Sequence, residues 1–158
     1  MKSLSRASML TALALASGLA VGQTSADVTA ETRTIFAAYA EHHDPSFYAE
    51  DATFTDMTNV SQPIVGRDAI GGMLAMFYGG AFGDGHYKDS TWIADGHKVL
   101  NEFTFVGTHT GDLNGIPPTG RAVELHMMSI YHVEDGYIRW ARLYYDSATL
   151  LRQLGLMP

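Results

Sequence analysis

Cysteine is absent from all 158 residues of the sequence. Disulfide bonds, thiol nucleophiles and thiolate metal sites are therefore excluded. Basic residues are few, ten against 17 acidic ones, and they form no cluster or stripe. Such a surface does not favour a nucleic acid or an anionic membrane as a partner. No HExxH motif or comparable set of spaced ligands occurs, so we predict no metal site.

Long apolar runs are also scarce, and the one that stands out covers residues 7–22. Two basic residues precede it and small residues follow it, an order that is typical of a secretory signal peptide. Its 16 residues fall short of the roughly 20 apolar residues that span a bilayer. We therefore predict a leader over residues 1–26, cleaved after Ala26 or alternatively after Ala20. The product is expected to be secreted or periplasmic, with no stable membrane anchor after cleavage.

Cleavage after Ala26 leaves residues 27–158, enough chain for one compact domain with its own core. All 17 acidic residues stay in this part and two of the ten basic residues leave with the leader, so the formal charge changes from −7 to −9. No repeat, low-complexity run or linker divides it. We predict a single domain whose acidity serves solubility.

Helical and strand patterns follow one another in a definite order. Apolar residues at helical spacing predict helices over residues 30–43 and 66–78, with a strand between them over 52–57. Further strands are predicted from β-branched and aromatic residues over 87–94, 98–110, 122–133 and 137–146. Ser147 is expected to cap a short last helix. This order predicts an α+β fold in which a curved antiparallel sheet wraps over the N-terminal helices.

Several short motifs in the C-terminal half occur in a fixed order and at close spacing. They are Gly107-Thr108-His109-Thr110-Gly111, the GIPPTGR segment 115–121, the DGYI segment 135–138, and Asp146 followed by the LLRQLG segment 150–155. The set resembles the SnoaL-like polyketide cyclase (ester cyclase) family of the nuclear-transport-factor-2-like superfamily. The match is clear over about residues 103–156 and looser at Phe54, Gly66-Arg67 and the second helix.

The resemblance implies a cone-shaped, cystatin-like α+β barrel with one apolar pocket, and frequent homodimers formed through the open sheet face. It implies a small apolar or aromatic carbonyl-bearing ligand and a cyclase-type or isomerase-type reaction without a metal or organic cofactor. Cyclases of the family close a ring by intramolecular aldol condensation, with a carboxylate near the end of the last strand as acid and base. Asp146 is the position that matches this pattern.

Asp146 therefore has two interpretations. Period-two spacing puts it on one strand face with Tyr144, Arg142 and Trp140, which we expect to bind the substrate. Arg142 departs from the tryptophan that is common in the family. An arginine there either pairs with Asp146 and weakens it as a base, or anchors an anionic substrate. The alternative is that Asp146 caps the following helix, because it stands beside Ser147.

Four other residues are candidates for the site. His126 is a second catalytic candidate if it faces the pocket, but the opposite parity of its strand is more apolar, which would turn it towards solvent or a dimer interface. His109 is expected to contact substrate or to hydrogen-bond within a turn. Tyr39 and Phe77 lie on apolar helix faces, where they line the pocket or pack in the core. A carrier or sensor that binds a small ligand without turnover is the alternative function.

Overall fold

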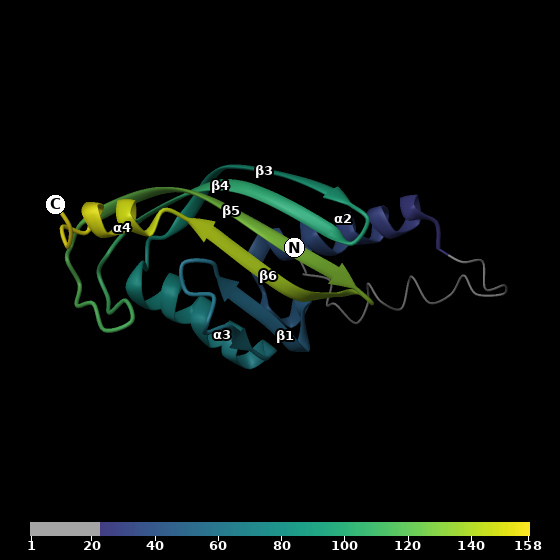
Figure 1. Cartoon of the computed structure of the whole chain (residues 1–158), viewed down its shortest axis with the longest axis horizontal. Coiled ribbons are helices and arrows are strands. Elements are labelled where there is room, and N and C mark those ends of the chain that lie inside the picture. The colour runs from purple at the N-terminus through teal and green to yellow at the C-terminus, as the bar shows by residue number, and fades with distance from the viewer. Residues whose placement is uncertain (1–22) are drawn as a thin grey trace, which may run out of the picture.

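The computed structural model describes residues 23–158; most of the expected leader falls on residues 1–22 and lies outside the described residues (Figure 1). In chain order the elements are α2 (Ser25–His42), the 3-10 turn η1 (Pro45–Phe47), β1 (Tyr48–Asp56), β2 (Ile64–Val65), α3 (Arg67–Ala75), the π-helical turn η2 (Met76–Ala81), β3 (His86–Asp95), β4 (Lys98–Thr108), β5 (Ala122–Glu134), β6 (Tyr137–Tyr145) and α4 (Ser147–Gln153). The helices and strands expected from the sequence are present, and the α+β class is confirmed. Within residues 23–158 no helix is both long and apolar enough to cross a membrane.

Helix α2 begins five residues earlier than its apolar pattern predicts, because a polar cap extends it. The Thr24 hydroxyl accepts a hydrogen bond from the Asp27 backbone N–H at 3.2 Å. In return, the Asp27 carboxylate accepts one from the Thr24 backbone N–H at 3.0 Å. This reciprocal pair satisfies backbone donors that the first turn leaves without helical partners.

One six-stranded sheet runs through the molecule in the order β2-β1-β6-β5-β4-β3. Strands β3 to β6 form the expected antiparallel meander. Strand β1, however, pairs with β6 in parallel, so the sheet is mixed rather than wholly antiparallel. The difference arises because β1 and β6 are far apart in the chain, and tertiary packing rather than a short turn sets their relative direction.

The two faces of the sheet differ in burial. On β5 the buried residues alternate along one face and are Val123, Leu125, Met127, Ser129, Tyr131 and Val133. Helices α2 and α3 pack against the strands on this inner face, where Phe36, Tyr39 and Ile70 join the core (Figure 1). The opposite parity of β5, which includes His126, lies on the outer face.

The loop between β4 and β5 folds back onto η2 and so forms part of the inner wall. The backbone N–H groups of Thr110 and Gly111 both donate to the Ala81 carbonyl, at 3.0 and 3.2 Å. A Cβ atom on Gly111 would overlap the Gly80 carbonyl, so only glycine allows this approach.

The Thr24 cap gives a first prediction, which distinguishes the two expected cleavage products. A chain that begins at Val21 keeps Thr24, whereas one that begins at Asp27 does not. We expect the shorter chain to unfold with a free energy lower by about 1 kcal/mol, measured by urea denaturation. Thr24→Ala in the longer chain should reproduce most of this loss. Equal stability of the two chains would show that the cap contributes nothing.

Gly111 gives a second prediction. Gly111→Ala should lower the free energy of unfolding by about 1–3 kcal/mol, because the added methyl group forces the loop away from η2. Gly72→Ala is the matched control, since Gly72 lies in α3 with open space around it. That variant should be neutral or more stable by roughly 0.5–1 kcal/mol. Chemical denaturation of both variants measures the contrast, and similar effects at the two positions would argue against the close contact.

Candidate functional site

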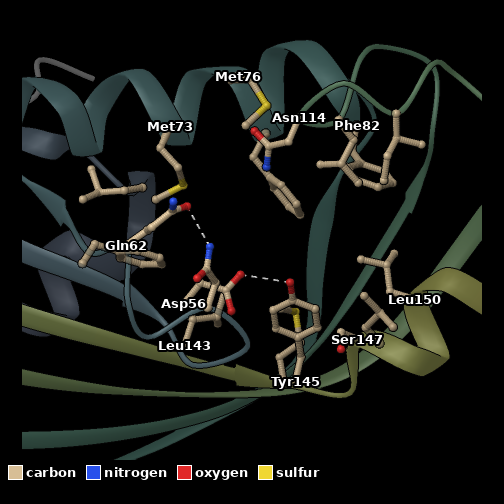
Figure 2. Close-up of a pocket in the computed structure, with 18 of the residues that line it drawn as sticks. Asp56, Gln62, Met73, Met76, Phe82, Asn114, Leu143, Tyr145, Ser147 and Leu150 are labelled. Carbon is tan, nitrogen blue, oxygen red and sulfur yellow. Dashed lines mark hydrogen bonds between the residues drawn. The ribbon is translucent and has the colours of Figure 1, made fainter.

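A cavity of about 610 Å³ lies between the inner face of the sheet and the helical segment α3–η2, and it extends to α4. Its walls are mainly apolar, with Phe54, Met73, Met76, Phe77, Phe82, Met127 and Leu143 among them. The polar side chains are few, and they are Asp56, Asn59, Gln62, Asn114, Tyr145 and Ser147. Figure 2 shows Met73 and Met76 on one side of this space and Asp56, Leu143 and Tyr145 on the other. An apolar cavity with a few polar groups is typical of a small-molecule site.

Asp56 and Tyr145 form the polar centre of the cavity. Asp56 is the last residue of β1 and has the same parity as the buried Phe54, so it faces inwards. The parallel register places Asp56 opposite Leu143, two residues before Tyr145. The Tyr145 hydroxyl donates to Asp56 Oδ2 at 3.0 Å (Figure 2).

The other carboxylate oxygen of Asp56 is held by the turn after the strand. Asp56 Oδ1 accepts from the Thr58 backbone N–H at 2.8 Å and from the Thr58 hydroxyl at 2.7 Å. These bonds fix the orientation of the carboxylate, while Oδ2 faces Tyr145. A fixed carboxylate beside a phenol can serve as a paired proton acceptor and donor.

Tyr145 is suited to the donor role. Burial raises the pKa of the Tyr145 phenol, and the nearby Asp56 carboxylate raises the pKa further, although a hydrogen bond with Thr58 acts in the opposite direction. A negative charge next to the phenol disfavours a second one. The hydroxyl therefore keeps its proton at neutral pH.

Two amide side chains extend the polar side of the cavity. The Asn59 Nδ2 group donates to Gln62 Oε1 at 3.0 Å, and the Ser61 hydroxyl donates to Asn59 Oδ1 at 3.1 Å. Asn59 and Gln62 both line the cavity, and Figure 2 shows Gln62 near Asp56. They offer neutral donors and acceptors to a ligand without adding charge.

Asp146 does not point into this cavity, and the expected geometry of a catalytic Asp146 is not found. Its side chain is 62% exposed and caps α4. Asp146 Oδ1 accepts from the Ala148 backbone N–H at 2.9 Å, and Oδ2 accepts from the Thr149 hydroxyl at 2.6 Å. The bonds from Thr149 hold the pKa of Asp146 below its ordinary value, with smaller help from Ala148 and Arg152. The structure thus shows the capping alternative.

Trp140, Arg142 and Tyr144 also lie away from the cavity, contrary to the expectation that they bind substrate there. None of them is among the cavity-lining residues. The pleat of β6 turns Ala141, Leu143 and Tyr145 inwards, so the alternate residues Trp140, Arg142 and Tyr144 face outwards. On the outer face Trp140 stacks on His132, with ring centroids 5.4 Å apart, and the Arg142 guanidinium lies 4.6 Å from the Trp140 ring centre.

The remaining candidates fall in three environments. His126 is exposed on the outer face and hydrogen-bonds Thr104 at 3.2 Å, so it does not reach the cavity. His109 is fully buried outside the cavity lining, and its Nδ1 bonds Thr119, which fits the turn interpretation. Tyr39 is a core residue that lines only a smaller inner cavity, whereas Phe77 lines both cavities.

Asp56 and Tyr145 were missed by the sequence reasoning. The available signal was strand parity. Asp56 lies two residues after the apolar Phe54, and Tyr145 lies two residues after Leu143, so each shares a strand face with an apolar residue. Nothing in a single sequence indicated that the two strands pair. Within residues 23–158 no group of three or more histidine, aspartate or glutamate side chains is arranged to hold a metal ion.

The fold and the position of the cavity define the class of protein. A curled sheet that closes over helices around an apolar cavity is the nuclear-transport-factor-2-like architecture. The family model of the SnoaL-like polyketide cyclases matches residues 30–154, and the chain belongs to this family.

Solved structures agree with this fold. A SnoaL-like protein from Jannaschia sp. CCS1 has a TM-score of 0.74 at 14% identity, covering 87% of this chain and 100% of that one. A phenazine biosynthesis-related protein from Pseudomonas aeruginosa has a TM-score of 0.73 at 16% identity, covering 94% of both chains. A protein with a ketosteroid isomerase-like fold from Catenulispora acidiphila has a TM-score of 0.62 at 22% identity, covering 82% of this chain and 95% of that one. Comparison with curated proteins finds no match.

The cap at Asp146 gives a third prediction. Asp146→Ala should destabilise the fold more than Asp146→Asn, because asparagine can still cap the helix and removes only the charge. The pKa of Asp146 is lowered on folding, so its charge stabilises the fold above pH 3.8 and this contribution is lost as the pH falls below that value. Urea denaturation should therefore show that Asp146→Ala lowers the free energy of unfolding less at pH 3 than at pH 7. A variant effect that does not depend on pH would contradict the charged cap.

Proposed function

We propose that this protein binds a small, largely apolar, carbonyl-bearing molecule in the 610 Å³ cavity and moves a proton at the carbon next to the carbonyl. The observation that carries the proposal is the Asp56–Tyr145 pair, which is the one directly bonded acid and phenol among the described cavity residues. Asp56 is the base and Tyr145 is the acid.

In the proposed reaction, Asp56 Oδ2 takes the proton from the carbon, and the electron pair of the broken C–H bond forms an enolate. The Tyr145 hydroxyl moves its hydrogen bond from Asp56 to the enolate oxygen, where negative charge develops. The enolate carbon then attacks a second carbonyl of the same molecule, and protonated Asp56 returns its proton to the alkoxide that forms. Alternatively, where a C=C bond is conjugated with the enolate, Asp56 returns the proton to the far carbon of that dienolate. The first outcome is a ring-forming aldol step and the second is an isomerisation.

The surroundings of the pair support this chemistry. A bound apolar ligand displaces water from the cavity, and this water would otherwise compete for Asp56 Oδ2 and for the enolate. Hydrogen bonds from Tyr145 are also stronger in a water-poor site. Membership of the SnoaL-like family supports the same reaction class, because the resemblance implies ring closure without a cofactor.

Binding without turnover is the second candidate, and one observation favours it. Three donors already meet the Asp56 carboxylate, two from Thr58 and one from Tyr145. Oδ2 already accepts the Tyr145 hydrogen bond, so a C–H group of a ligand has to compete for this oxygen. A carrier would use the same cavity and the same hydrogen bonds, but it would release its ligand unchanged.

Export and dimerisation remain proposals. The apolar run and its flanking residues support a cleavable leader over residues 1–26 and a secreted or periplasmic location. Exposed apolar residues on the sheet support a homodimer, because Ile93 and Leu100 are 67% and 37% exposed.

The fourth prediction tests the proton transfer with 2-tetralone, an apolar bicyclic ketone with an enolisable carbon. In D₂O the protein should accelerate exchange of the protons next to the carbonyl, followed by NMR. Asp56→Asn should remove this acceleration by about 10²-fold or more, and Tyr145→Phe should reduce it, because general acid–base groups contribute 10²–10⁴-fold. Binding of the ketone, measured by calorimetry, should persist in both variants.

Asp146→Asn and Tyr144→Phe are matched controls, since both side chains lie outside the cavity, and they should exchange like the unaltered protein. Tight binding without any accelerated exchange would favour the carrier. Full activity of Asp56→Asn would remove Asp56 as the base.

A further inference from the structure

A second cavity of about 60 Å³ lies directly behind the first. Five side chains line both spaces and form the partition between them; these are Phe54, Met73, Phe77, Met127 and Leu143. Two of the five are methionines, whose unbranched side chains change rotamer easily. The partition can therefore open by side-chain movement alone, which would join the two cavities into one site.

Hydroxyl groups distinguish the inner cavity from the partition. Tyr39, Tyr78, Tyr131 and Ser129 all line it. The Tyr39 hydroxyl is bonded to the Tyr48 hydroxyl at 3.2 Å. Tyr78 makes ring contacts with His43, Phe77 and Tyr87, but its hydroxyl forms no hydrogen bond with any residue in 23–158.

Because no side chain within residues 23–158 holds the Tyr78 hydroxyl, it is available to donate to a ligand in the inner cavity. Burial raises the pKa of Tyr78, so the hydroxyl stays neutral and keeps its proton as a donor. Within residues 23–158 the fully buried side-chain atoms without a partner are His109 Nε2 and His132 Nδ1, so the Tyr78 oxygen remains accessible to a water-sized group. A ligand oxygen in the inner cavity can take the place of water at this hydroxyl.

The π-helical turn η2 explains how Tyr78 reaches this position. The Phe82 N–H donates to the Phe77 carbonyl at 2.9 Å, the five-residue spacing of a π-helix. In this wider turn Met76 lines the main cavity, Phe77 lines both cavities and Tyr78 lines the inner one. One short turn thus connects the two spaces, and π-turns of this kind occur frequently at functional sites.

Size limits what the inner cavity can hold. An engineered cavity of about 150 Å³ accommodates benzene, whereas a single water needs about 10–15 Å³. The inner cavity, at about 60 Å³, is too small for a ring but large enough for a substituent of a few atoms. The hydroxyls on its wall favour a substituent that contains oxygen over a purely apolar one.

We propose that the inner cavity is a subsite for a small oxygen-bearing substituent, a hydroxyl or carbonyl group, of the ligand held in the main cavity, with the Tyr78 hydroxyl as its hydrogen-bond donor. The ligand class is then an apolar skeleton with one carbonyl at Asp56–Tyr145 and a second oxygen function at the opposite end. This inference rests on the proposed function, since it needs a ligand in the main cavity.

The test compares 2-tetralone with its 6-hydroxy and 7-hydroxy derivatives by calorimetry on the full-length protein. The unaltered protein should bind at least one hydroxy derivative about 2- to 10-fold more tightly than 2-tetralone, the gain expected from one net hydrogen bond. Tyr78→Phe keeps the ring contacts and should abolish the preference. Tyr144→Phe, on the outer face of the sheet, should keep it.

A second variant tests the subsite independently, in case Tyr78→Phe does not fold. Ser129→Thr narrows the inner cavity by one methyl group and should weaken binding of the preferred hydroxy derivative more than that of 2-tetralone. Equal affinity for all three ketones in the unaltered protein, or a preference that survives in Tyr78→Phe, would overturn the subsite.

Proton exchange on 2-tetralone separates this failure from failure of the proposed function. If the preference is absent while exchange is accelerated, the subsite is wrong and the proposed function stands. If no ketone binds at all, both are overturned.

Discussion

The parallel pairing of β1 with β6 is the contact on which the candidate site depends. Because the two strands run in the same direction, their C-terminal ends meet at one edge of the cavity. Asp56 at the end of β1 and Tyr145 at the end of β6 are 89 positions apart in the chain, yet their side chains are joined by a 3.0 Å hydrogen bond. The loop after β4 and the helix α4 add walls around this edge, but neither supplies the bonded pair. Loss of the pairing would leave a carboxylate and a phenol in separate, hydrated positions.

Strand pleating decides which side chains face the cavity, and the sequence predicted this direction correctly for β5 only. On β5 the more continuously apolar parity was expected to be buried, and the structure confirms it with Val123, Leu125 and Met127 on the inner face. The same rule applied to β6 would have selected Leu143 and Tyr145. The opposite face of β6, with Trp140 and Arg142, was instead predicted to bind the substrate, because the chemistry of these side chains suits a ligand. Burial depends on the apolar pattern, whereas chemical suitability says nothing about direction, so the two criteria select opposite faces of β6.

Local features were more predictable than those that depend on distant contacts. The order of helices and strands, the last helix and its possible cap at Asp146 are all set by neighbouring residues, and they are present in the structure. The parallel partner of β1 and the π-helical geometry of η2 depend on tertiary packing, which overrides local preference. The Asp56–Tyr145 bond and the placement of Tyr78 are consequences of those two features. For that reason the fold could be predicted from one sequence while the centre of the site could not.

The same pairing also explains why the site expected from the family resemblance and the site found here are close in space but differ in residue. Asp146 comes directly after the last residue of β6, and Asp56 is the last residue of β1. Parallel neighbours deliver both positions to one edge of the sheet, so either strand end can supply a carboxylate to the same cavity. In this chain the helix after β6 uses the hydrogen-bonding capacity of Asp146, with both oxygens bonded to α4. No helix begins directly after β1, and the turn at Thr58 bonds only one oxygen of Asp56, which leaves the other directed at Tyr145. The segment after each strand, a helix in one case and a turn in the other, therefore decides which of the two carboxylates can act on a ligand.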